Sequence, residues 1–117
     1  MQIVISGKGI ELTEAIKNYV DKKISGLDKF HPNIIRAIVE VGVETHHHLK
    51  GEIFVAECKL EIPGNDVFAS KNEKTLYKAI DKVRDYLEIE LKKSKAKTHE
   101  KEKKAKREVR ASKEYQP

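Results

Sequence analysis

Residues 35–62 read IRAIVEVGVETHHHLKGEIFVAECKLEI and contain two runs in which apolar and polar side chains alternate. The apolar sets of the two runs are Ile35, Ala37, Val39, Val41 and Val43, then Phe54, Ala56, Cys58, Leu60 and Ile62. Alternation with a period of two residues is typical of a strand that has one dry and one wet face. Glu44 to Gly51 lies between the runs and suits a hairpin loop. This stretch therefore predicts the two central strands of a sheet.

The residues before this stretch predict a strand followed by a helix. Met1 to Ser6 alternates in the same way, and the glycines at positions 7 and 9 end the alternation. Thr13 is a suitable helix N-cap, and apolar residues then recur at helical spacing. These apolar residues are Ile16, Val20, Ile24 and Leu27. We expect an amphipathic helix over about residues 13–28, which Pro32 prevents from continuing.

The residues after this stretch predict a short fourth strand and a second helix. Pro63-Gly64-Asn65-Asp66 is a strong turn signal, and Val67 to Ala69 begins the strand. Ser70-Lys71-Asn72-Glu73 has the S-x-x-E form of a capping box, which predicts that the helix begins at about residue 73. Its apolar side is predicted to be Leu76, Ile80, Val83, Leu87 and Leu91. We expect this helix to run beyond residue 92.

The predicted order is β-α-β-β-β-α, which gives an α+β fold with a four-stranded, largely antiparallel sheet. Because polar residues alternate along the central strands, both helices are expected on one face of the sheet, with the other face open to water. We expect one domain over residues 1–94. Residues 95–117 form a basic tail in which only Val109 and Tyr115 are large apolar side chains, so we expect it to be disordered or to extend the helix.

The positive charge of the chain is concentrated in its last 26 residues, which hold 11 Lys/Arg against 4 Asp/Glu, a net charge of +7. Residues 1–91 hold 13 basic and 15 acidic residues and are therefore slightly acidic. Lysines placed near phosphates release condensed counterions, so this distribution favours a polyanion such as ribosomal RNA as the partner. The alternative is a charged tail that only makes the domain soluble.

Several classes of protein are not supported by the sequence. No apolar run approaches the roughly 18 residues that span a bilayer, and Met1 leads directly into a strand, so we expect a cytoplasmic protein without a membrane partner. The single cysteine, Cys58, lies on the apolar side of its strand and is predicted to be a core residue. It cannot form an internal disulfide.

Neither catalysis nor metal binding is predicted. Among His46, His47 and His48, neighbouring side chains of an extended loop point in alternating directions, and only Glu44 is nearby as a further ligand. A polar hairpin loop is the favoured interpretation. No serine is set in a nucleophile elbow, and carboxylates of the second helix have basic neighbours, as Asp81 has Arg84. We expect no enzyme activity, cofactor, metal or small-molecule substrate.

The basic residues of the two helices are the better candidates for a binding site. If the helices pack side by side, their outward lysines form a ridge that the tail prolongs, and such a surface suits a phosphate backbone. Lys74, Lys78 and Arg84 belong to the same ridge, while Tyr77 and Tyr86 are interpreted as partial core. The predicted RNA-binding residues are Lys17, Lys22, Lys23, Lys29, Lys82, Lys92, Lys93, Lys95 and Lys97.

Two segments resemble the ribosome hibernation-promoting factors, also called ribosome-associated inhibitor or sigma-54 modulation proteins. The first is Ile3-Val4-Ile5-Ser6-Gly7-Lys8 with Ile10-Glu11-Leu12-Thr13-Glu14-Ala15-Ile16-Lys17-Asn18-Tyr19-Val20. The second is Ala69-Ser70 with Leu76-Tyr77-Lys78-Ala79-Ile80-Asp81-Lys82-Val83. The resemblance covers about residues 1–97 and implies the same β-α-β-β-β-α fold, similar to that of double-stranded RNA-binding domains.

The resemblance also implies a function and a partner. Such a factor is not an enzyme; it occupies the messenger and transfer RNA channel of the small ribosomal subunit, touches 16S-type ribosomal RNA and blocks translation under stress or in stationary phase. Lys17, Lys23 and Lys29 match basic positions of the family around the first helix, and Lys93 and Lys97 match basic positions at the end of the second. Because no second domain follows, the chain resembles the short form.

The second helix departs from the family pattern. Where relatives commonly carry two cations in a Lys-Leu-x-Arg-Gln-Leu run, this chain has Tyr86-Leu87-Glu88-Ile89-Glu90-Leu91, and Gly26 replaces a frequent lysine. Our hypothesis is that the tail lysines, Lys92 through Lys106, compensate for these missing cations. Two other functions stay open: a general double-stranded RNA-binding module, and a regulator that binds a protein partner, as the sigma-54 modulation label suggests.

Overall fold

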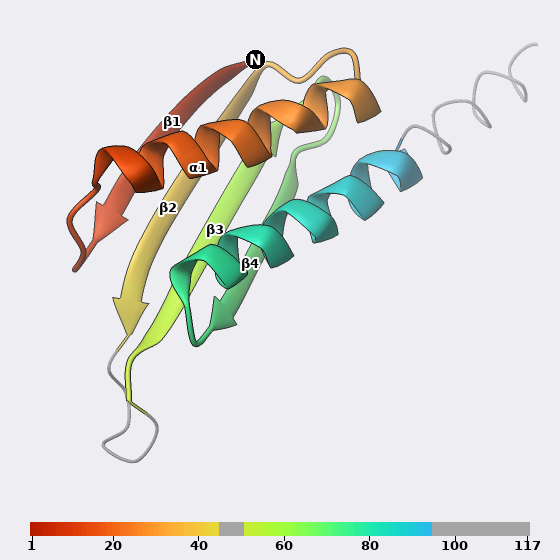
Figure 1. Cartoon of the computed structure of the whole chain (residues 1–117). Helices are drawn as coiled ribbons and strands as arrows, with labels where there is room; N and C mark the ends of the chain where they lie inside the picture. Colours follow the sequence, from red (N-terminus) through yellow and green to blue (C-terminus); the bar gives the residue numbers. More distant parts are fainter. Residues whose placement is uncertain (45–50, 95–117) are drawn as a thin grey trace, which may run out of the picture.

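The computed structural model of the chain describes residues 1–44 and 51–94, and these form one sheet covered by helices (Figure 1). The strands are β1 (Gln2–Lys8), β2 (Arg36–Glu44), β3 (Ile53–Glu61) and β4 (Val67–Glu73). The helix α1 (Glu14–Ser25) is followed directly by the 3-10 helix η1 (Gly26–Phe30). A second long helix begins at residue 76 and continues to residue 94, the last one described.

The four strands lie in the order β1-β2-β3-β4. β1 pairs with β2 in parallel, while β2 with β3 and β3 with β4 are antiparallel pairs. The parallel pair requires a crossover connection, which α1 supplies. Both helices lie on the same face of the sheet and leave the other face uncovered (Figure 1). The predicted α+β class and the largely antiparallel sheet with two helices on one face are confirmed.

The core lies between this covered face and the two helices. The apolar positions of the strands alternate inward as predicted, so that Ala37, Val39, Val41, Ala56 and Leu60 are buried. The helices contribute their apolar sides, including Val20, Ile24, Leu27, Ile80, Val83, Leu87 and Leu91. Cys58 is fully buried among them, and its burial raises the pKa of the thiol to about 12. Cys58 is therefore a core residue, as predicted.

The predicted capping box is wrong. β4 continues through Glu73, so Ser70 is a strand residue that pairs with Glu57, and its hydroxyl donates to Glu57 Oε1 at 3.3 Å. Thr75 caps the second helix instead, because its Oγ1 accepts a hydrogen bond of 3.2 Å from the Lys78 amide. The S-x-x-E pattern depends only on neighbouring residues in the sequence and does not take strand pairing into account. Pairing with β3 keeps residues 70–73 in an extended conformation.

Two other boundaries differ from the predictions. The sequence places Ile35 on the apolar side of a strand, but this side chain is 59% exposed, because β2 begins at Arg36 and the neighbouring Ile34 enters the core instead. The first helix is predicted to continue to residue 28, but its α-helical part ends at Ser25 and the last turn is 3-10. This tighter turn buries Leu27 and leaves Phe30 near the second helix.

Among residues 1–44 and 51–94, the structure contains no helix with the length and apolar character needed to span a membrane.

Candidate nucleic-acid interface

The two helices run in the same direction across the sheet, so the C-terminal end of α1 and residue 94, the last described residue of the second helix, lie at the same side of the molecule (Figure 1). A helix C-terminus carries partial negative charge, which favours nearby cations. Lys22 and Lys23 occupy the last turn of α1, and Lys92 and Lys93 lie near the end of the described part of the second helix. The fold therefore gathers basic residues from both ends of the domain sequence.

A surface groove lies between the end of α1 with η1 and the second helix. It is lined by Lys22, Lys23, Gly26, Lys29, Asp81, Arg84 and Asp85. We call it the helix-end groove. Four cations and two carboxylates line it, so its local charge is positive although residues 1–91 are slightly acidic. In the described part of the chain neither Lys22 nor Lys29 forms an ion pair, which leaves both ammonium groups available to an external anion.

The ring of Phe30 lies beside this groove with three cations around it. The Lys29 and Lys92 ammonium groups are each 5.1 Å from the ring centroid, and the Arg84 guanidinium carbon is 5.7 Å from it. We call these four residues the Phe30 cluster. Cations at this distance are attracted by the ring quadrupole. Phe30 thus helps to hold together basic side chains from η1 and from the second helix.

Asp81 positions one lysine of the groove. The Tyr19 hydroxyl donates a hydrogen bond of 2.5 Å to Asp81 Oδ1, and the Lys23 ammonium lies 3.5 Å from the same oxygen. This hydrogen bond, together with burial, raises the pKa of Tyr19 from 10.0 to about 12. The sequence suggests Arg84 as the partner of Asp81. The structure corrects this, because Arg84 instead pairs with Asp85 and Glu88.

The structure brings together some of the predicted lysines and separates others. Lys22, Lys23 and Lys29 line the helix-end groove, and Lys92 belongs to the Phe30 cluster. Lys93 is nearby in sequence but pairs with Glu90 at 3.5 Å. Lys17 pairs with Glu14 at 3.8 Å, and Lys82 pairs with Glu73, so both belong to other parts of the surface. Lys95 and Lys97 lie outside the described residues.

Sequence reasoning misses two members of the site. It assigns Arg84 to the ridge but not to the binding residues, and it gives Phe30 no role in the site. Only the helix packing brings positions 29, 30, 84 and 92 together, so spacing along the chain gives no signal for the cluster. The two tyrosines interpreted as partial core are half exposed: Tyr77 packs edge-on against Tyr19, and Tyr86 lies under the Lys71 ammonium.

Metal binding is not predicted by the sequence. Among residues 1–44 and 51–94, no group of three or more His, Cys, Asp or Glu side chains is placed to hold a metal ion. The three histidines at positions 46–48, interpreted as a polar loop, lie outside these ranges.

Comparison with known proteins identifies sequence relatives. The pattern of the family described as sigma 54 modulation protein / S30EA ribosomal protein matches residues 3–99. The ribosome hibernation promotion factor of Deinococcus radiodurans is 36% identical over 96 residues, which is 81% of this chain and 50% of that protein. The ribosome hibernation promoting factor of Pseudomonas putida is 34% identical over 97 residues, 83% of this chain and 89% of that protein. The chain thus spans half the length of the first relative and most of the second.

Solved structures support the fold. The N-terminal domain of Thermus thermophilus Protein Y is 33% identical and superimposes with a TM-score of 0.69, covering 80% of this chain and 98% of that domain. A ribosomal subunit interface protein from Coxiella burnetii superimposes with a TM-score of 0.71 over 82% of this chain and 99% of that protein. At 22% identity, this second likeness concerns the fold alone.

Proposed function

The chain belongs to the sigma 54 modulation protein / S30EA ribosomal protein family, and we propose on this basis that it is a ribosome hibernation factor. In this proposal it binds small-subunit ribosomal RNA in the channel used by messenger and transfer RNA, and it blocks translation by occupying that channel. Relatives at 31% to 36% identity carry the name of ribosome hibernation factors, which is not the name of an enzyme class.

The observation that carries the proposal is the gathering of cations at the helix-end groove. A phosphate backbone is recognised by charge and shape, and Lys22 and Lys29 are free of ion pairs in the described part of the chain. Lys92 is paired with Glu88 at 3.9 Å, but exposed ion pairs are worth only about 0 to 1 kcal/mol. A phosphate group can therefore replace Glu88 as the partner of Lys92 at little cost.

The two glutamates that replace family cations in the second helix, Glu88 and Glu90, have basic partners within the chain. Glu88 is held by Arg84 and Lys92, and Glu90 is held by Lys93. These contacts neutralise much of the charge that would otherwise repel RNA. We propose that Lys95 and Lys97, together with the rest of the 95–117 tail, add the phosphate contacts that the glutamates remove. Replacing both lysines by glutamine in the full chain should then weaken ribosome binding and flatten its salt dependence.

The main test is co-sedimentation of the full chain with purified ribosomes at several salt concentrations, with a translation assay on the same samples. The double variant Lys22→Glu/Lys29→Glu should bind less tightly, and its log affinity should fall less steeply with log salt by about 0.7 to 0.9 for each phosphate that the variant no longer neutralises. Lys74→Glu/Lys78→Glu is the matched control, because both lysines are exposed near the opposite end of the second helix. An equal weakening in the two variants would mean that net charge, rather than the groove, governs binding.

Two further experiments distinguish the proposed function from a general RNA-binding module and from a regulator that binds protein. A bare RNA duplex added as competitor should displace the protein from ribosomes only at large excess. Equal affinity for the duplex would indicate a general double-stranded RNA-binding module. Ribonuclease treatment should release the protein from its partner, and a complex that survives this treatment would indicate a regulator that binds protein.

A further inference from the structure

The face of the sheet that the helices leave open carries a row of apolar side chains. In the strand register Val4 pairs with Ile38, Ile38 with Lys59, and Lys59 with Phe68, so the row crosses all four strands. Val4 is 41% and Phe68 56% exposed. The Lys59 ammonium turns to Asp66 at 3.5 Å, and its aliphatic stem can cover apolar surface. We call this set the apolar row. In the isolated protein the apolar row is in contact with water, and exposure of apolar surface to water is unfavourable.

The row on one side of the apolar row holds the Arg36–Glu61 ion pair at 2.8 Å, and the row on its other side is acidic. Glu40 and Glu57 are direct partners in the β2–β3 register. Like charges directly opposite each other in a sheet are destabilising. The Ser70 hydroxyl donates to Glu57 at 3.3 Å, but in the described ranges neither glutamate forms an ion pair. The chain thus holds, next to the apolar row, two carboxylates that have no ion-pair partner among the described residues.

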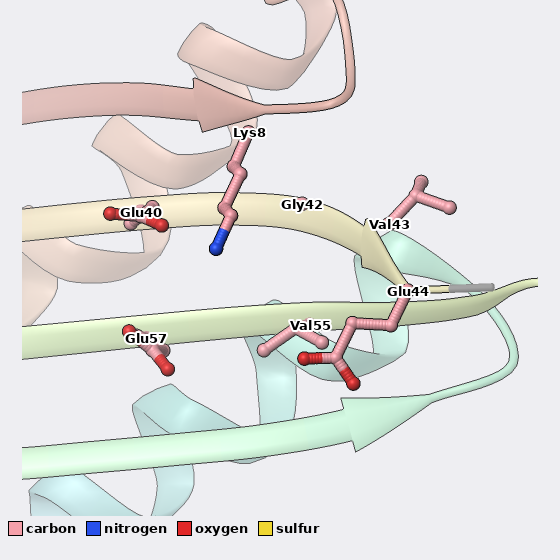
Figure 2. A pocket seen from close by; sticks show the side chains of 7 residues that line it. All are labelled: Lys8, Glu40, Gly42, Val43, Glu44, Val55 and Glu57. Carbon is pink, nitrogen blue, oxygen red and sulfur yellow. The ribbon is translucent and has the colours of Figure 1, made fainter. Parts of the chain in front are cut away.

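A shallow hollow adjoins these carboxylates (Figure 2). It is lined by Lys8, Glu40, Gly42, Val43, Glu44, Val55 and Glu57, so three carboxylates face one ammonium group. Lys8 extends across β2 beside Gly42 but forms no ion pair with a described residue. A Cβ atom at Gly42 would lie 2.8 Å from the Lys8 carbonyl oxygen, so position 42 cannot hold a side chain that would fill the hollow.

We propose that this open face docks a basic segment of a ribosomal protein, with apolar side chains on the apolar row and a lysine or arginine at Glu40 and Glu57. A cation placed between the two glutamates would relieve their repulsion, and burial of the apolar row would remove it from water. The carboxylates repel phosphate, which disfavours RNA as the occupant. The inference rests on the proposed function, because that function brings the protein to the ribosome. The helix-end groove is then left for RNA.

The test places a photo-crosslinker on each face of the full chain. p-Benzoylphenylalanine replaces Phe68 on the open face or Tyr77 on the helix face, since both side chains are exposed aromatics. Purified ribosomes are bound, isolated by sedimentation, irradiated, and the adducts identified by mass spectrometry. The Phe68 probe should react with a Lys/Arg-rich peptide of a ribosomal protein, and the Tyr77 probe should not yield that adduct.

A charge-matched pair of variants then tests the role of the glutamates. Glu40→Gln and Glu57→Gln are introduced together into the chain that carries the crosslinker at position 68. The yield of the Phe68 adduct should then fall at least about threefold, as expected when two exposed charge interactions are removed. Glu11→Gln with Glu52→Gln changes the net charge equally at two exposed positions away from the row and should leave the yield unchanged. An unchanged yield in the first pair would overturn the proposal.

The nature of the adduct and the sedimentation result separate the two proposals. If the protein sediments with ribosomes but the Phe68 probe reacts with RNA, with a second copy of the chain, with its own tail or with nothing, the docking proposal alone is wrong. If the protein does not sediment with ribosomes, the proposed function fails and the docking proposal fails with it.

Discussion

The covered and open sides of the sheet carry different chemistry and are built in different ways. On the covered side, helix packing brings Lys22, Lys29 and Arg84 together from distant parts of the chain. On the open side, strand register alone places Val4 beside Ile38 and Glu40 beside Glu57. A cationic surface and an acidic, partly apolar surface are thus separated by the thickness of one sheet and one helix layer. Under the two proposals above, these surfaces contact two chemically different partners.

The largest effect is expected in the core, which lies between the covered face of the sheet and the helices, because the whole fold depends on it. Leu87→Ala removes a fully buried side chain of the second helix and should lower the free energy of unfolding by about 2 to 5 kcal/mol. Urea denaturation followed by circular dichroism measures this. Ile89→Ala, at a neighbouring but half-exposed position, should change stability by less than about 0.5 kcal/mol. Similar destabilisation in both variants would show that the packing of this helix has been assigned to the wrong side.

The second effect concerns the Phe30 cluster beside the helix-end groove. Phe30→Ala removes the ring shared by Lys29, Arg84 and Lys92, each contact being worth about 0.5 to 1 kcal/mol at exposed sites. We expect ribosome affinity in the co-sedimentation assay to fall by about tenfold, equivalent to about 1.4 kcal/mol. Phe30→Tyr keeps an aromatic ring and should bind nearly normally. If Phe30→Leu also binds normally, the ring acts through its volume and the cation contacts are incidental.

The difference between the faces also explains what the sequence could predict. Alternation identified the buried side of each central strand and therefore the open side as well, because a strand has only two faces. The helical repeat of Ile16, Val20 and Ile24 identified the side of α1 that meets the sheet. The element order, the fold class and the place of Cys58 were predicted from these periodicities.

The groove could be predicted only in part, since it depends on contacts between residues far apart in the sequence. The lysines of α1 were identified by charge, but the contact of Phe30 with Arg84 spans more than 50 positions and follows from how two helices pack. The same limit explains the wrong partner for Asp81: Arg84 is three positions away, yet Lys23 from another helix is the one that pairs with it. Local patterns also misplaced the helix start at residue 73, because strand pairing with β3 overrode the capping signal.

A substitution of Asp81 should change ribosome affinity less than Phe30→Ala does, and it should increase the affinity rather than lower it. Asp81→Asn removes the carboxylate that holds Lys23 at 3.5 Å, so Lys23 can contact phosphate. Binding should tighten at low salt, and the slope of log affinity against log salt should steepen by about 0.7 to 0.9. Asp66→Asn makes the same charge change at the edge of the open face, where Asp66 pairs with Lys59. An equal steepening there would mean that only net charge matters.

The Tyr19 hydrogen bond predicts a pH dependence that reports on the same network. The pKa of Tyr19 is raised in the folded state from 10.0 to about 12, chiefly by its hydrogen bond to Asp81, so its contribution to stability is complete below pH 10 and is lost as pH rises toward 12. The stability advantage of the wild type over Tyr19→Phe should shrink over this window. Phenolate absorbance should also show one late-titrating tyrosine, which Tyr19→Phe removes. An advantage that is constant with pH would contradict the hydrogen bond.

The smallest effect is expected on the open face of the sheet. There the sign of the change in stability is more informative than its size. Glu40→Gln removes the repulsion between Glu40 and Glu57 and should stabilise the free protein by about 0.2 to 1 kcal/mol, measured as a higher urea midpoint. Glu52→Gln, at an exposed position outside the strand pair, should be neutral. Destabilisation by Glu40→Gln would mean that the pair is already compensated within the chain. A pair that costs stability in the free protein yet strengthens docking is the signature of a surface shaped for a cationic partner rather than for the fold.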